Sequence, residues 1–202
     1  MNTILHIDTS GPDALIGISQ DLKIIASKQN SQSNTHGEFV QAGVDELFRD
    51  NAMQLKDIDA IGVTMGPGSY TGLRVGLASA KGLAFALNKP LIGLSTLTLL
   101  AKAAVGHLTA TENLLVNEKQ LQVFSMIDAR RMEIFGAIYN SSLEYLAAEK
   151  AMILDEALLL ALLSNGPLIC IGSGVAKTKI LTQHADFHNY SPLFLECSYT
   201  IH

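Results

Sequence analysis

Short apolar runs separated by turn residues open the chain. They cover residues 4–7, 15–19 and 22–26, and the two breaks are Gly11-Pro12-Asp13 and Gln20-Asp21. Runs of this length bounded by Gly, Pro and Asp are typical of β-strands joined by tight turns. The pattern therefore predicts three consecutive antiparallel strands.

Segments that predict helices then alternate along the chain with segments that predict strands. Val40, Val44, Leu47 and Phe48 recur at helical spacing and predict a helix from Thr35 to Asp50. The elements expected after it are a strand at 59–64, a glycine turn at 66–68, a helix at 71–87, a strand at 90–94, and a helix that Ser95 or Thr96 caps and Gly106 ends.

The second half repeats this plan. Strands are expected at 121–127, 133–139 and 143–146, followed by a helix at 155–163, a strand at 168–171 and a helix after Gly174. Two copies of one unit indicate duplication, and antiparallel strands that feed strand-helix crossovers indicate an α/β fold with a mixed sheet in each half. We place the boundary near residues 109–113, which gives subdomains 1–108 and 109–202. The second copy lacks a counterpart of residues 90–108, so we expect the natural chain to extend beyond residue 202.

Composition restricts the class of protein. The chain has 202 residues, 48% of them hydrophobic, with a net charge of -5 and a pI near 5.6. An acidic chain is unlike a stand-alone nucleic-acid binder, so tRNA contact is expected only through a complex. Cys170 and Cys197 form no CxxC pair, residues 1–8 do not read as a signal peptide, and no apolar run nears the roughly 20 residues of a membrane span. We expect a cytoplasmic protein without membrane contact.

A glycine-rich segment, GPGSYTGLRVG at 66–76, joins a predicted strand to a predicted helix. Its glycines allow a sharp turn, and free amides at a helix start bind anions. The spacing matches neither the GxGxxG fingerprint nor a phosphate loop with its Gly-Lys pair. A ligand site and a tight packing turn both remain open.

The following helix carries small residues at every fourth position, namely Gly72, Gly76, Ala80 and Ala84. A stripe without bulk lets another element approach closely. That element is either the chain's own sheet or a partner helix.

Four segments together resemble the TsaB (YeaZ) family of tRNA threonylcarbamoyladenosine biosynthesis. They are ILHIDTS at the start, VTMGPGSYTGLRVGLASAKGLAFALNKPLIG at 63–93, IDARRMEIFGAIY at 127–139 and IGSGVAKTK at 171–179. The long central block is the specific one. The resemblance implies an actin-like, ribonuclease H-like ATPase (ASKHA) fold.

The resemblance also implies a role as a dimerisation and activating subunit. The implied partners are a catalytic TsaD-like subunit, a TsaE-like ATPase and, for the chain alone, a second copy. TsaB proteins pair through their first two helices, which favours the small-residue stripe as the interface, with Arg74 and Lys81 at its rim. The expected interface residues are Gly72, Leu73, Gly76, Leu77, Ala80, Ala84, Val40 and Val44.

The catalytic relative TsaD holds a metal through an HxxxH pair, which on a helix brings both imidazoles to one face. Thr96 and Leu100 stand at those positions here, and leucine binds no metal. We therefore expect no catalytic residue, no metal and no enzyme activity in the chain alone. His184 and His188 form another HxxxH pair, for which a solvated loop is favoured over a metal site. His36 is interpreted as a capping or surface residue.

Asp8-Thr9-Ser10 matches the first phosphate turn of actin-like ATPases, and Gly172 and Gly174 fall where these proteins contact adenosine. The second phosphate turn is degraded, since Asp128-Ala129-Arg130 brings bulk and charge where a glycine is usual. Weak binding of ATP or ADP at a partner interface stays open, beside a structural role for Asp8. The alternative functions are an actin-like kinase or ATPase and a regulatory nucleotide-binding module.

Overall fold

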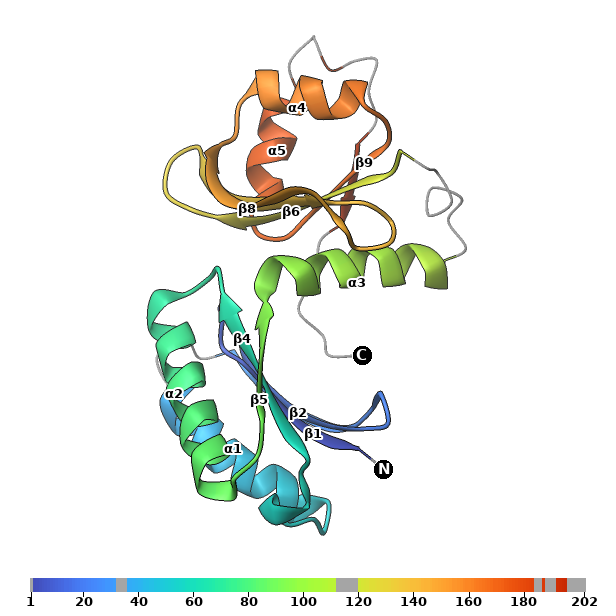
Figure 1. Cartoon of the computed structure of the whole chain (residues 1–202). Helices are drawn as coiled ribbons and strands as arrows, with labels where there is room; N and C mark the ends of the chain where they lie inside the picture. Colours follow the sequence, from blue (N-terminus) through green and yellow to red (C-terminus); the bar gives the residue numbers. More distant parts are fainter. Residues whose placement is uncertain (1, 32–35, 112–119, 184–186, 188–191, 196–202) are drawn as a thin grey trace. The chain divides into compact units, whose positions relative to one another are not determined.

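Two compact units make up the computed structural model (Figure 1), which describes residues 2–31, 36–111, 120–183, 187 and 192–195. The first unit runs to Thr96 and the second begins at Leu97. The sequence prediction assigned the helix at this point to the first half. The contacts group it with the second unit, where Leu100 lies beside Gly172 and Thr98 Oγ1 lies 3.0 Å from the Tyr139 hydroxyl.

A five-stranded mixed sheet forms the first unit, in the order β3-β2-β1-β4-β5. β1 pairs antiparallel with β2 and parallel with β4, and β4 pairs parallel with β5. Helices α1 and α2 cover one face of this sheet (Figure 1). The elements are β1 (Thr3–Asp8), β2 (Ala14–Gln20), β3 (Lys23–Asn30), α1 (His36–Asp50), η2 (Leu55–Asp57), β4 (Ala60–Gly66), α2 (Tyr70–Leu87) and β5 (Leu91–Ser95).

The core of the first unit lies between this sheet and its two helices. Strand residues that alternate along β1, β2 and β4, such as Leu5, Ile16 and Ile61, are fully buried against the inner faces of α1 and α2. Because side chains of a strand alternate between faces, these residues all point to the helical side. Burial of this apolar face provides the main driving force for folding of the unit.

The second unit has the same sheet order, β10-β9-β6-β7-β8, in which β6 takes the place of β1. α4 and α5 lie on one face of this sheet, and α3 lies on the other (Figure 1). The elements are α3 (Thr96–Ala110), β6 (Gln122–Asp128), β7 (Glu133–Tyr139), β8 (Tyr145–Ile153), α4 (Glu156–Ser164), β9 (Leu168–Ile171), α5 (Val175–Leu181) and β10 (Leu193–Leu195).

The repeated sheet order confirms the predicted duplication and the α/β class. Three details of the prediction were wrong. The fifth strand thought to be missing from the second copy is β10, which pairs parallel with β9. The predicted strand at 143–146 begins and ends too early, because Leu143 has a φ of 63° in the preceding turn and β8 runs from Tyr145 to Ile153. α3 passes Gly106, which is exposed and tolerated within the helix.

Candidate functional site

The glycine-rich segment after β4 packs against the turn that ends β1. The Ser69 amide donates to the Ser10 carbonyl at 2.7 Å, and the Thr9 hydroxyl donates to the Gly72 carbonyl at 2.7 Å. A Cβ at Gly68 would overlap the Ser10 carbonyl oxygen, and a Cβ at Gly72 would overlap that of Thr9. These glycines therefore allow one backbone to lie directly against another, which supports the packing interpretation of the turn.

The small-residue stripe of α2 faces its own unit, which corrects the predicted partner-facing orientation. Gly72, Gly76, Ala80 and Ala84 are all buried, and a Cβ at Gly76 would overlap the Thr9 hydroxyl. The predicted interface residues of α1 are also buried, since Val40 and Val44 are 1% and 3% exposed within the core. These six residues are used by the fold. Leu73 and Leu77 are half-buried, and Leu77 packs against the same core.

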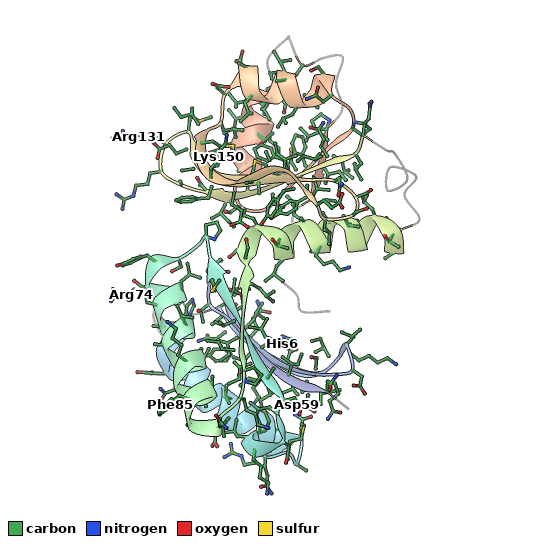
Figure 2. All side chains as sticks on the ribbon, viewed as in Figure 1. His6, Asp59, Arg74, Phe85, Arg131 and Lys150 are labelled. Carbon is green, nitrogen blue, oxygen red and sulfur yellow. The ribbon has the colours of Figure 1, made fainter. Side chains whose placement is uncertain are left out.

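The opposite side of α2 is exposed and carries two large aromatic side chains. Tyr70 is 75% exposed and Phe85 is 90% exposed. Arg74 lies over the Tyr70 ring, with its guanidinium carbon 5.3 Å from the ring centroid. Figure 2 shows Arg74 and Phe85 pointing away from the sheet. A Cβ at Gly82 would meet no described atom within 4 Å.

Asp8 makes its hydrogen bonds within its own turn. Its Oδ1 accepts from the Ser10 amide at 2.9 Å and from the Ser10 hydroxyl at 2.7 Å. Thr9 and Ser10 are buried, at 1% and 4% exposure. A carboxylate that bonds the amide two residues later stabilises a turn. These contacts are those of the structural role considered for Asp8, and its use with a nucleotide stays a prediction.

The second unit repeats the packing of a glycine turn on a strand end. The Gly174 amide donates to the Met126 carbonyl of β6 at 3.3 Å. A Cβ at Gly172, whose φ is 102°, would overlap that same carbonyl, and a Cβ at Gly174 would lie 2.7 Å from the Met126 Cβ. Close packing thus explains both glycines. Their proposed contact with adenosine stays a prediction.

A lysine that the sequence analysis did not single out completes this turn. The Lys177 ammonium of α5 forms a salt bridge with Asp128 and donates to the carbonyls of Ala129 at 2.7 Å and Glu133 at 2.8 Å. The Ser173 hydroxyl accepts from the Asp128 amide at 2.8 Å. In the sequence, this contact is indicated by a lysine in the first turn of the helix that follows the glycine turn. The Asp128 carboxylate is therefore paired with a cation from its own unit.

The positions equivalent to the metal ligands of the catalytic relative are buried. Thr96 is 0% exposed and Leu100 is 1% exposed, and the methyl carbon Cδ1 of Leu100 would lie 2.9 Å from a Cβ at Gly172. No group of three or more His, Cys, Asp or Glu residues that could hold a metal occurs among the described residues. His184 and His188 lie outside the described residues. His36 is 5% exposed, so the interpretation as a surface residue was wrong.

The comparisons with known proteins agree with this architecture. Residues 23–163 match the family described as TsaD, tRNA N6-adenosine threonylcarbamoyltransferase. The chain is 32% identical to the tRNA threonylcarbamoyladenosine biosynthesis protein TsaB of Escherichia coli, over 68% of this chain and 54% of that protein. The chain belongs to this family, in its TsaB (YeaZ) branch. TsaB of Bacillus subtilis is 29% identical over 88% of this chain and 73% of its own length.

A solved TsaB-family structure shows the fold. YeaZ from Pseudomonas aeruginosa matches 98% of this chain and 85% of its own chain, with a TM-score of 0.68 and 22% identity. The predicted α/β fold with a mixed sheet in each half is confirmed, and it is the fold of YeaZ. The chain spans about half to three quarters of the length of the curated TsaB and related proteins it matches. No helix among the described residues is long and apolar enough to cross a membrane.

Proposed function

We propose that the chain is the accessory subunit of a tRNA N6-threonylcarbamoyladenosine transferase complex, in which it scaffolds and activates a TsaD-like catalytic subunit. The observation that carries the proposal is membership of the TsaB branch, because relatives from E. coli and B. subtilis are named as biosynthesis proteins for this modified nucleoside. The complex also includes a TsaE-like ATPase, and the chain forms a homodimer when it is alone.

The absence of catalysis by this chain is supported by the start of α3. Thr96 and Leu100 are one helical turn apart, which is the spacing of two metal ligands on one face of a helix. A buried leucine at the second position offers no lone pair to a metal. We therefore expect the purified chain to make no modified adenosine and to hold no stoichiometric metal until its partners are added.

The partner surface is proposed to be the exposed side of α2. Phe85 and Tyr70 supply large apolar rings, and exposed aromatic residues are the usual anchors of protein interfaces. Arg74 and Lys81 are exposed beside them and add charge at the rim. This proposal keeps the predicted use of the second helix and moves the contact from its buried stripe to its outer face.

Phe85→Glu tests the proposed function. We expect this variant to melt like the parent chain, because the side chain is 90% exposed, and to lose about 30- to 1,000-fold in affinity for a TsaD-like subunit. Capture is measured by size-exclusion chromatography of co-expressed proteins, and activation by formation of modified adenosine in tRNA. Ile180→Glu is the matched control, because Ile180 is an exposed helical residue of the second unit.

Two outcomes would contradict the proposal. One is full activation of the catalytic subunit by Phe85→Glu, and the other is formation of modified adenosine by the chain without partners. Binding of ATP or ADP stays a secondary proposal. An ADP-dependent rise in melting temperature of the chain alone would support it.

A further inference from the structure

The turn between β6 and β7, residues 128–133, is held in place from its base. Lys177 binds Asp128 and two carbonyls of this turn, and its side chain is only 14% exposed. The Glu133 amide donates to the Arg130 carbonyl at 3.2 Å, which closes the turn. The backbone of the turn is therefore pre-organised, and groups at its tip do not need to be ordered when a ligand binds.

The tip of this turn carries two arginine side chains and three backbone amides that can donate hydrogen bonds. Arg130 and Arg131 are exposed, and their guanidinium groups have no hydrogen-bond or ion-pair partner within the described ranges. Their backbone amides, and that of Met132, likewise make no hydrogen bond to the part of the chain that the structure describes. Figure 2 shows Arg131 extending away from the sheet. Consecutive free amides beside guanidinium groups make a surface for an anion.

Arg131 occupies a backbone conformation that arginine does not favour. Its φ is 59°, in the left-handed region where glycine or asparagine costs less.

Acidic side chains lie at the base of the turn and beside Met132. Asp128 is paired with Lys177, so its carboxylate does not compete for Arg130 or Arg131. Glu133 is the other acidic residue of the turn, and its side chain is exposed at the start of β7. Asp155 and Glu156 line a pocket together with Met132, and the Asp155 carboxylate accepts a hydrogen bond from the Leu158 amide at 2.8 Å.

We propose that this arginine turn binds phosphates of the tRNA backbone. The inference rests on the proposed function, which brings tRNA to the chain. A phosphodiester offers the acceptor oxygens that two guanidinium groups and free amides complement. Contact with two phosphates is weak by itself, which agrees with the acidic composition and with tRNA binding mainly through the complex.

Salt dependence of binding to unfractionated tRNA tests the arginine turn. Each phosphate contact contributes about 0.7 to 0.9 to the slope of log affinity against log salt. The double variant Arg130→Gln with Arg131→Gln should therefore lose about 1.4 to 1.8 of this slope, and about tenfold or more in affinity near 50 mM salt. Fluorescence anisotropy with the full chain measures both quantities.

The matched control is Lys56→Gln with Lys102→Gln, which removes the same charge from two exposed positions outside the turn. This control should lose less than about threefold in affinity, because long-range charge effects are screened. Equal losses of slope in both double variants would overturn the proposal. The proposal would also be overturned if the double variant lost affinity for poly-glutamate but kept its affinity for tRNA. That result would favour an acidic protein as the partner of the turn.

Two further measurements keep the result interpretable. Thermal melting checks that the double variant is folded. If the double variant is unfolded, the salt dependence of tRNA binding is measured with Arg131→Gly alone, because glycine adopts the positive φ without strain. The assay that measures capture of the catalytic subunit is carried out without RNA. A variant that still captures this subunit, but whose tRNA affinity depends less on salt, would show that the arginine turn can fail without failure of the proposed function.

Discussion

Gly76 lies on the buried side of α2 and Gly82 on an exposed side, and the structure predicts opposite effects when each is changed to alanine. A Cβ at Gly76 would overlap the Thr9 hydroxyl and lie 3.4 Å from the Thr9 Cβ. Thr9 is 1% exposed, and its hydroxyl is already bonded to Gly72, so it has little freedom to move. A Cβ at Gly82 would meet no described atom within 4 Å.

The expected magnitudes follow from two opposing contributions. Alanine is more favourable than glycine inside a helix by about 1 kcal/mol, and this gain applies at both positions. Overpacking a buried contact costs about 1–3 kcal/mol, and this cost applies only at Gly76. Gly76→Ala should therefore lower the free energy of unfolding by up to about 2 kcal/mol, whereas Gly82→Ala should raise it by about 0.5–1 kcal/mol.

Thermal melting followed by circular dichroism measures the difference. A change of 1 kcal/mol corresponds to about 2–4 °C in Tm for a chain of this size, so the two variants should differ by several degrees. Gly76→Arg should abolish the cooperative transition of the first unit, because no space exists for the longer side chain. A folded Gly76→Arg variant that fails only to bind a partner would refute the inward packing of this helix face.

Three further predictions concern other parts of the molecule. Lys177→Met should destabilise the second unit by about 1–3 kcal/mol in urea unfolding, because charge-assisted hydrogen bonds to Asp128 and two carbonyls are lost; unchanged stability would contradict this. Burial lowers the pKa of His6 below 6.5, so its contribution to stability is complete above pH 6.5 and declines as the pH falls below that value. The free energy of unfolding of His6→Gln should therefore decline less over the same pH range. Burial raises the pKa of Cys170 to about 12, so a thiol reagent at pH 8 should label it only after unfolding, which peptide mass spectrometry detects.

Most of the fold could be predicted from the sequence because hydrophobic periodicity is a local signal. The short apolar runs of β1 and β2 and the helical spacing of α1 each depend on neighbouring residues, and the duplication is visible as a repeated order of elements. The errors occurred where contacts between residues far apart in the sequence determine the structure. β10 is only three residues long, and it forms by pairing with β9. Gly106 does not end α3, because packing of its buried face stabilises the helix beyond it.

The candidate site was less predictable because a helix has two sides and spacing does not say which one is buried. Gly72 and Gly76 formed a clear stripe, and the sequence allowed this stripe to meet either a sheet or a partner. The Thr9 side chain decides the matter, since it fills the space beside Gly76. The exposed side, with Tyr70 and Phe85, is marked only by residues offset from the stripe, and large apolar residues on a helix are more often core than interface.

The two strand ends show how one duplicated turn diverged. Asp8 and Asp128 each end the central strand of their sheet, and each strand end is packed against by a glycine turn. In the first unit a neighbouring serine supplies both hydrogen bonds to the carboxylate, whereas in the second unit Lys177 supplies a full positive charge from α5. An internal ammonium at this position removes the need for a bound cation to neutralise Asp128. The second turn can therefore keep its shape without nucleotide, and Arg130 and Arg131 at its tip are available for the phosphate contact that we propose.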